Sequence, residues 1–387
     1  MKFAHLGDCH LGSWRIPSLQ QLNLESFRKA IDICISEKVD FVLIAGDLFD
    51  SAYPPIETLK EAFFELKRLK DSKIPCFLIA GSHDFSASGK TFLDVLERAG
   101  FCKNVYSSEE REDSLILSPT LHESVAIYGY PGKKAGMEVS ELRKVKLQTA
   151  PGFFKIFMLH TSIKGAVGSL PIDSISESEL PEADYYALGH LHIDYTDGKF
   201  VYSGPIFPNN FQELEELKYG SFFIVEVNNN QMSYNKINLK LKEVEVIDLE
   251  IKNALTATET ILFELGKRNL QDKIVMLKLS GNLEEGKVGN INFKLIEEKT
   301  ISQNAFTFIR SISKLSMEET HLEIQVSEME QVEEVILKEI IEKNPGQFIK
   351  FVNPLINSLS LEKQEDEKSA VFEERLFSEV NKILDIK

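Results

Sequence analysis

Residues 41–50 are Phe-Val-Leu-Ile-Ala-Gly-Asp-Leu-Phe-Asp, an apolar run that passes directly into a glycine and two aspartates. The run Phe41–Ala45 predicts a strand, because a short continuous apolar stretch bounded by turn residues is typical of one. Asp47 and Asp50 follow its carboxyl end. In open α/β sheets, functional sites assemble where the strands end. This stretch therefore predicts an α/β fold with a polar site at the carboxyl edge of a sheet.

The same alternation continues through roughly the first 240 residues, where short apolar runs are separated by amphipathic helical stretches. The predicted strands are Lys2–Leu6, Phe41–Ala45, Cys76–Ala80, Val125–Tyr130, Phe154–Leu159, Tyr185–Leu188, Phe200–Ser203 and Ser221–Val227. The predicted helices are Leu19–Glu37, Ile56–Lys70 and Thr91–Ala99. A second, smaller α/β unit is predicted from residue 241, with strands at Val244–Ile251, Ile274–Ser280 and Phe306–Ile312.

Polar motifs stand directly after five of these strands, and they contain five of the eight histidines of the chain. The motifs are Asp8-Cys9-His10, Gly46-Asp47-Leu48-Phe49-Asp50, Gly81-Ser82-His83-Asp84, His160 and Gly189-His190-Leu191-His192. Alternate residues of an extended segment face the same way, so the Asp-x-His and His-x-His pairs can each bind one ion. Imidazole and carboxylate groups without thiolates suit Mn²⁺, Fe²⁺ or Zn²⁺. Their number predicts two ions rather than one.

Each motif also has an ordinary explanation. A lone Asp-x-His is most often a solvated loop, Gly-Asp is common in turns, and Gly-x-His fits a turn with a core histidine. The occurrence of all of them in this order, each at a strand end, favours a metal site. The remaining histidines, His5, His122 and His321, have no such context and are predicted to be structural or surface residues.

Composition sets limits on the class of protein. The 387 residues allow two or three domains at roughly 150 residues each. Hydrophobic residues make up 43%, which excludes wholesale disorder. No apolar run approaches the ~20 residues of a membrane span, the N-terminus turns polar too soon for a signal peptide, and the four cysteines form no CxxC pair. We therefore expect a cytoplasmic protein with no membrane association.

The net charge of −16 argues against a protein that simply coats DNA, because such proteins are basic. Acidic residues concentrated at a metal site weaken that argument, since bound cations invert the local field. Any surface that binds DNA is therefore predicted to be a local patch. The candidates are Trp14 and Arg15 beside the first motif and Lys90 after the third.

Together the motifs resemble those of the calcineurin-like metallophosphoesterase superfamily, D-x-H, G-D-x-x-D, G-N-H-D, H and G-H-x-H. Three details are similar to the double-strand-break repair nucleases of the bacterial SbcD type and the archaeal and eukaryotic Mre-eleven type. They are Asp8-x-His10-Leu11-Gly12, Gly46-Asp47-Leu48-Phe49 and Tyr185-Tyr186-Ala187-Leu188-Gly189-His190-Leu191-His192. The segments Tyr202–Pro205 and Phe211–Glu216 occupy the family's final loop.

The resemblance implies a fold and a division into domains. The fold is an α/β metallophosphoesterase sandwich, two β-sheets flanked by helices, with a small α/β capping domain and a C-terminal helical segment that binds a partner. The implied domains are the nuclease domain at 1–240, the capping domain at 241–326, and the helical linker and ATPase-binding helix-loop-helix at 327–387. Motif-level support lies within residues 1–220, and from 241 onward the resemblance is architectural.

The resemblance also implies roles for the site residues. Asp8, His10, Asp47 and His192 would bind one metal, and Asp47 would bridge to a second. Ser82, His160 and His190 would complete the second ion. The ions would be two Mn²⁺, with Mg²⁺, Fe²⁺ or Zn²⁺ as alternatives. His83 would assist the leaving oxygen as an acid or transition-state stabiliser, and a hydrogen bond that its ring donates to the Asp50 carboxylate would orient it.

Two positions depart from the family pattern. Ser82 replaces the usual Asn ligand, and because a hydroxyl is shorter and a weaker donor, it predicts a loosely held second metal and a dependence on added Mn²⁺. Asp50 stands where many archaeal relatives carry His. An aspartate there resembles the general superfamily and the bacterial branch, and it is expected to alter which direction of cleavage is efficient.

Partner surfaces are predicted from apolar helical faces. The helical stretches Gln347–Ser358 and Ser369–Ile386 each place apolar residues on one face, and the resemblance implies that residues 345–387 bind an SMC-like coiled-coil ATPase of the SbcC or Rad-fifty type. Packing onto the chain's own body is the alternative. Helices 56–70 and 91–99 are expected to form a homodimer interface, with core packing as the ordinary explanation.

These observations predict a Mn²⁺-dependent DNA nuclease of double-strand-break repair. It would act as a 3′–5′ exonuclease on double-stranded ends and an endonuclease on single-stranded DNA or hairpins, through a hydroxide activated by two metals. One alternative is another metallophosphoesterase, a phosphodiesterase or phosphatase. The other is a catalytically weak scaffold that tethers DNA to the ATPase, and Ser82 is the feature that supports it.

Overall fold

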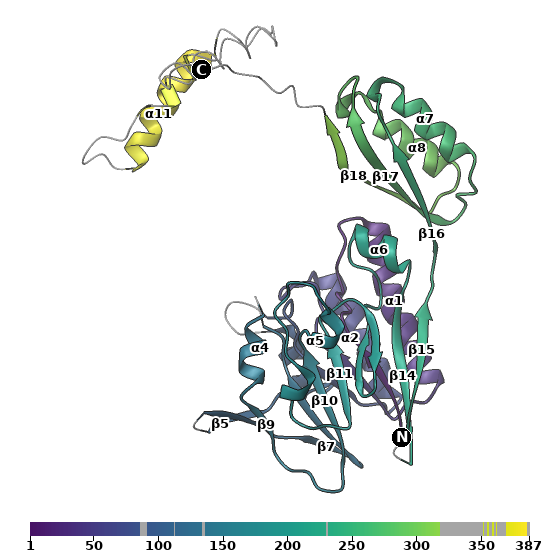
Figure 1. Ribbon diagram of the computed structural model, residues 1–387, viewed down its shortest axis with the longest axis vertical. Helices are drawn as coiled ribbons and strands as arrows, with labels where there is room; N and C mark the ends of the chain where they lie inside the picture. The colour runs from purple at the N-terminus through teal and green to yellow at the C-terminus, as the bar shows by residue number, and fades with distance from the viewer. Residues whose placement is uncertain are drawn as a thin grey trace. The chain divides into compact units, whose positions relative to one another are not determined.

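The computed structural model describes residues 1–85, 91–111, 113–133, 136–229 and 231–317. Beyond these it describes the helix α11 (Ser369–Leu384) and positions 351, 354, 355, 358, 359 and 361. The chain divides into two compact units, Met1–Glu318 and Glu319–Lys387. The first unit, coloured purple to green in Figure 1, carries all the predicted site motifs.

Two sheets dominate the first unit, and each has six strands within the described residues. In order across the first sheet they are β15 (Gln231–Leu239), β14 (Gly220–Asn228), β1 (Lys2–Leu6), β2 (Phe41–Ala45), β3 (Cys76–Ile79) and β4 (Lys103–Asn104). Across the second they are β12 (Asp194–Asp197), β13 (Phe200–Ser203), β11 (Tyr185–Gly189), β10 (Phe154–His160), β8 (Val125–Tyr130) and β7 (Thr120–His122).

The apolar run of β2 is continuous because both faces of its sheet are covered. Phe41 and Leu43 belong to a buried cluster shared with strands of the second sheet, where Ile156, Met158 and Tyr185 lie. Val42 and Ile44 point the other way, into a cluster formed with the helices. The inner cluster is therefore the core of a two-sheet sandwich.

Helices cover the outer faces of both sheets. The first sheet is covered by α1 (Pro17–Ser36), α2 (Ile56–Asp71) and α3 (Phe92–Arg98). The second is covered by α4 (Met137–Leu142) and by a small sheet of β5 (Ser108–Arg111), β6 (Ser114–Leu117) and β9 (Val145–Leu147). Short helical turns follow at α5 (Lys164–Val167) and Glu177–Glu179. The predicted sandwich of two sheets flanked by helices is confirmed.

A three-stranded parallel sheet follows in the described chain, formed by β16 (Glu243–Glu250), β17 (Lys273–Leu283) and β18 (Thr307–Met317). The helices α7 (Ala254–Gly266) and α8 (Phe293–Ser302) pack on one face, with a short turn of helix at Val288–Asn290. The other face packs against α1 and the short helix α6 (Phe211–Leu217), where Leu19, Leu214 and Met276 share one buried cluster. The domain boundaries at residues 240 and 326 remain predictions.

The C-terminal unit contains α11, which coincides with most of the predicted helix Ser369–Ile386. The first part of the predicted helical linker, residues 327–343, lies outside the described residues, as do most positions of Gln347–Ser358. Positions 351, 354, 355 and 358 are described and helical. In the described part of the chain, no helix is long and apolar enough to cross a membrane.

His5 is a buried histidine inside the sandwich, on β1 beside the second sheet. Its Nδ1 lies 2.8 Å from the hydroxyl oxygen of Tyr185, and its Nε2 is buried without a hydrogen-bond partner. Burial lowers the pKa of His5 to about 3. The ring is therefore neutral in the folded protein at neutral pH, which confirms the predicted structural role.

We expect His5 to reduce stability as the pH falls below about 6.5, its ordinary pKa in an unfolded chain. Between that pH and about 3, the unfolded chain binds a proton that the folded chain does not, so stability falls with pH. The loss between pH 7 and pH 5 is about 2 kcal/mol. Urea unfolding of wild type and His5→Gln at both pH values measures it. The variant should gain this amount relative to wild type at pH 5, and an unchanged difference between the two proteins would contradict the prediction.

Candidate metal centre

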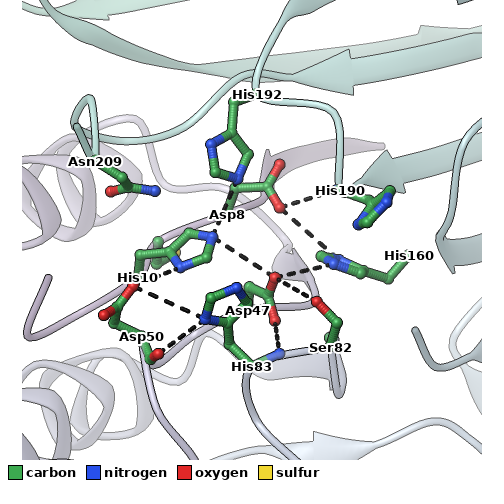
Figure 2. Close-up of polar contacts among 12 residues, drawn as sticks. Asp8, His10, Asp47, Asp50, Ser82, His83, His160, His190, His192 and Asn209 are labelled. Atoms are coloured by element: carbon green, nitrogen blue, oxygen red, sulfur yellow. Dashed lines mark hydrogen bonds and ion pairs between the residues drawn. The ribbon is translucent and has the colours of Figure 1, made fainter. Parts of the chain in front are cut away.

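The predicted site residues converge where the strand ends of the two sheets meet. Asp8 and Asp47 follow the parallel strands β1 and β2, and Ser82 and His83 follow β3. From the second sheet, His160 is the last residue of β10, and His190 comes directly after β11, where the two strands pair in parallel. Figure 2 shows these side chains pointing toward one another.

Four residues of this site have a strained backbone conformation. Asp8, His10, Asp47 and His190 all have positive φ, at 50°, 42°, 48° and 95° respectively. L-residues rarely adopt this conformation, and it persists only where surrounding contacts enforce it. The sharp turns let each strand end direct a polar side chain back toward the common centre.

The carboxylate of Asp47 occupies the centre of the cluster. Its Oδ2 lies 3.0 Å from Nε2 of His160 and 3.6 Å from Nε2 of His10, and the Ser82 hydroxyl donates to it at 3.5 Å. Its Oδ1 accepts the main-chain N–H of His83 at 2.7 Å. One carboxylate thus contacts residues from three other strand ends.

Glycine at position 81 is required by this arrangement. A Cβ atom on Gly81 would lie 2.2 Å from Oδ1 and 2.3 Å from the main-chain nitrogen of Asp47. Gly46 is equally constrained, since its φ is +87° and a Cβ atom there would lie 2.3 Å from Nδ1 of His160. The glycines of the motifs therefore make room for the polar side chains.

Ligand-type atoms form three groups, each within 4.8 Å, in the described residues. Asp8 belongs to two of them, and its Oδ1 also accepts the main-chain N–H of His190 at 2.9 Å. The groups are Asp8 with His10 and His192, Asp8 with Asp47 and His160, and His10 with Asp50 and His83. The first two consist entirely of predicted ligands.

His10, His160 and His192 share one orientation. Each ring places Nδ1 against an oxygen: the Asp50 carboxylate at 3.1 Å for His10, the Ala45 carbonyl at 2.9 Å for His160, and the Glu213 carboxylate at 2.9 Å for His192. Such outer contacts are typical of metal-binding histidines, because they fix the tautomer that leaves Nε2 as the ligand atom.

The inward nitrogens fit a cation at the centre. Nε2 of His10 and Nε2 of His192 face each other at 3.1 Å. Nε2 of His160 is buried and lies 3.0 Å from a carboxylate oxygen of Asp47. Lone pairs and carboxylates directed at one point are the donor set that a divalent metal of this class prefers. The residues present therefore fit the metal that their motifs predict.

Electrostatics couple the buried groups. Burial alone would raise the pKa of Asp47, but the charge and hydrogen bonding of His160 outweigh burial and hold this pKa well below its usual range. Burial would lower the pKa of His160, yet the Asp47 carboxylate raises it to about 10. Burial and the neighbouring His160 lower the pKa of His190 to about 4. Asp47 is thus ionised and His190 neutral at neutral pH.

The predicted contact between Asp50 and His83 is wrong in its details. Nδ1 of His83 lies 2.9 Å from the main-chain carbonyl oxygen of Asp50, whereas the Asp50 carboxylate is 3.9 Å away. That carboxylate is instead 3.1 Å from Nδ1 of His10. The reason is geometric: the chain turn after β2 directs the Asp50 side chain toward the first motif and its carbonyl toward His83. Asp50 therefore orients His83 through its main chain.

Asp84 secures the turns that follow β2 and β3. Its buried carboxylate accepts main-chain N–H groups from Leu48, Phe49 and Gly81 at 3.2, 3.0 and 2.9 Å. These bonds join the turn after β2 to the turn after β3. Asp84 therefore holds together the two loops that carry Asp47 and His83.

A cavity of about 710 Å³ opens beside the cluster. Ser82, His83 and His190 line it from the site, and Phe85, Lys133 and Ile172 are among the residues that line the rest. His83 is accessible from this side, with 49% of its side chain exposed. The cavity gives a substrate access to the cluster.

Of the three residues predicted to contact DNA, the structure describes Trp14 and Arg15. The indole N–H of Trp14 donates to the main-chain carbonyl of Pro208 at 2.8 Å, so this ring helps to hold the loop before α6. Arg15 is exposed, and Lys90 lies outside the described residues. Glu213, which contacts His192, is not among the site residues predicted from the sequence. The feature that could have identified it is its acidic side chain in the family's final loop.

The model for the family of calcineurin-like phosphoesterases matches residues 1–194. The chain is 29% identical to the "DNA double-strand break repair protein Mre11" of Sulfolobus acidocaldarius. The alignment covers 73% of this chain and 76% of that relative. For the protein of the same name from Methanocaldococcus jannaschii the identity is 27%, over 65% and 68%.

The chain is also 28% identical to the "Uncharacterized metallophosphoesterase YhaO" of Bacillus subtilis, over 73% of this chain and 69% of that protein. These matches confirm the expected resemblance to nucleases of the Mre11 and SbcD type and the expected class of enzyme, a metal-dependent phosphodiesterase. The chain belongs to the calcineurin-like phosphoesterase family.

Proposed function

We propose that this chain is a Mn²⁺-dependent DNA nuclease of double-strand-break repair. The observation that carries the proposal is the shared orientation of His10, His160 and His192, whose inward nitrogens converge with two carboxylates beside an open cavity. The names of the Mre11 relatives support DNA as the substrate.

Two cations would be held by the clustered residues. Asp8, His10, Asp47 and His192 would hold one, and Asp47 would be shared with Ser82, His160 and His190 for the other. Of these residues, Asp8, His10 and His192 lie in one ligand group, and Asp47 and His160 lie with Asp8 in another. When bound, such cations neutralise phosphate charge and lower the pKa of a bound water, which makes hydrolysis possible at neutral pH. We infer Mn²⁺ from the resemblance to Mre11-type nucleases, and the donor set of imidazole and carboxylate groups without thiolate is compatible with it.

The protein's own groups would bind and orient the phosphodiester. His83 lines the cavity, and its Nδ1 is oriented by the Asp50 carbonyl at 2.9 Å. This contact leaves Nε2 for the leaving oxygen, to which a protonated ring can give a proton. Asp84, by fixing both loops, keeps His83 in register with Asp47.

The side chain at position 82 bears on the choice between an active nuclease and a catalytically weak scaffold. Its hydroxyl donates to Asp47 at the long distance of 3.5 Å, so a short neutral side chain stands where the family supplies a longer amide. A weakly held second cation would lower activity at limiting metal. The other alternative, a phosphodiesterase or phosphatase acting on small substrates, is compatible with the family match alone.

Cleavage of end-labelled DNA tests the proposal. Wild type should degrade double-stranded ends with 3′–5′ polarity and cut single-stranded DNA or hairpins in the presence of Mn²⁺, and a chelator should abolish both activities. His83→Ala should lower the rate by about 10²–10⁴-fold, the usual contribution of a general acid. Ser82→Asn should reach half of its maximal rate at lower Mn²⁺ concentration than wild type. Hydrolysis of a model phosphodiester without any cleavage of DNA would instead support the small-substrate alternative.

A homodimer through helices α2 and α3 is also proposed. The apolar residues of these two helices fall into two groups. Four of them are fully buried in the chain's own core, namely Leu66, Leu69, Leu93 and Leu96. Phe64 and Val95 remain outside, with 58% and 46% of their surface exposed. These exposed apolar residues, rather than the buried leucines, are the ones that a second copy could cover.

The double variant Phe64→Glu Val95→Glu should therefore be monomeric in light scattering, while wild type has twice the monomer mass. Because both positions are exposed, the variant should keep the thermal stability of a folded monomer. A wild-type mass equal to that of one chain, or an unchanged mass of the variant, would refute the proposed interface.

The C-terminal residues 345–387 are proposed to bind an SMC-like coiled-coil ATPase. In α11, Phe372, Leu376 and Val380 recur at a spacing of four residues, which is typical of one helical face. Deletion of residues 345–387 should abolish co-purification with such an ATPase, while Mn²⁺-dependent cleavage by the remaining chain continues. Binding that survives the deletion would place the contact elsewhere.

A further inference from the structure

The carboxylate of Glu213 lies directly behind the predicted metal ligand His192. Its Oε1 is 2.9 Å from Nδ1 of the ring, and only 19% of the Glu213 side chain is exposed. We propose that Glu213 is a positioning residue, which directs Nε2 of His192 toward the cation without binding the cation itself. This inference rests on the proposed metal-dependent function.

His192 needs such a partner more than the other inward histidines do. His160 is fully buried, and a main-chain carbonyl at the end of β2 fixes its ring. His192 lies in the loop between β11 and β12, and 23% of its side chain is exposed. Rotation of a histidine ring about χ2 is weakly restricted by itself. The Glu213 contact is therefore the constraint that selects one orientation and one tautomer.

Glu213 is itself held firmly. Its Oε2 accepts the main-chain N–H of Asn209 at 2.9 Å, and its Oε1 accepts the side-chain amide of Asn210 at 2.6 Å. In return, the Asn210 side chain accepts the main-chain N–H of Glu213 at 3.0 Å and caps α6. These reciprocal bonds leave the carboxylate little freedom to turn away from His192.

The helix that carries Glu213 rests on packed structure. Leu214, the next residue, is fully buried in a cluster with Leu19 of α1 and Met276 of β17. Glu215 forms an ion pair of 2.5 Å with Lys278, which is also on β17. A positioning group is effective only if its own support is rigid, and α6 meets this requirement.

Direct Mn²⁺ binding tests the proposal on the full chain. The electron paramagnetic resonance signal of free Mn²⁺, followed during titration, gives the dissociation constant without any use of activity. Glu213→Ala should weaken Mn²⁺ binding by about 10–100-fold, the usual effect of losing an outer carboxylate partner. Glu213→Gln, which keeps a carbonyl oxygen that can accept from Nδ1, should recover part of the affinity.

Two controls separate positioning from a loss of structure or charge. Asn253→Ala removes the side-chain cap of α7 and should lower the thermal stability of the metal-free protein while leaving Mn²⁺ affinity near wild type. Glu216→Ala removes an exposed carboxylate from α6 and should also leave affinity unchanged.

Wild-type affinity in Glu213→Ala would overturn the inference, as would an equal loss in Asn253→Ala, since a general loss of stability would then explain the effect. Equal losses in Glu213→Ala and Glu216→Ala would also overturn it, because net charge would then be the cause. If wild type bound no Mn²⁺, the proposed function itself would fail, which is a different result from any of these.

Discussion

Most of the site depends on where the Asp47 carboxylate is held. It lies in contact with groups from the ends of β1, β3 and β10, and the absence of a side chain at Gly81 leaves it the necessary space. Its negative charge keeps the pKa of the buried His160 at about 10. In a metal-free protein these opposite charges stabilise each other, so the site remains assembled without a cation. The two sheets are joined at this point by polar groups, and elsewhere by the apolar inner cluster.

The sequence predicted the fold and the site cluster because both follow from local patterns. The run Phe41–Ala45 is apolar on both faces since each face is covered, and a polar group after a buried strand has few places to lie. The glycines at 46, 81 and 189 mark the same strand ends, where neighbouring backbone or side-chain atoms exclude a Cβ atom. Motif, strand and cavity therefore coincide, and the order of motifs was enough to identify the family.

Three features could not be predicted from the sequence. The first two depend on side-chain direction rather than on spacing. Asp50 was expected to orient His83 through its carboxylate, but its side chain and its carbonyl serve different histidines. The apolar stripe of α2 gave no indication that Leu66 faces the core and Phe64 faces outward. The strand β15 was missed because its residues alternate between polar and apolar and most are exposed, so it lacks the continuous apolar run that marks β2.

The pairing of β1 has a consequence for synthesis of the chain. β1, which begins at the second residue, lies between β2 and the antiparallel strand β14. One edge of the first strand therefore stays unpaired until about residue 228 has been made. At a translation rate of about 5–20 residues per second, this exposes a strand edge for about 11–46 s. Throughout that interval the nascent chain offers backbone hydrogen-bonding groups to any other extended segment nearby.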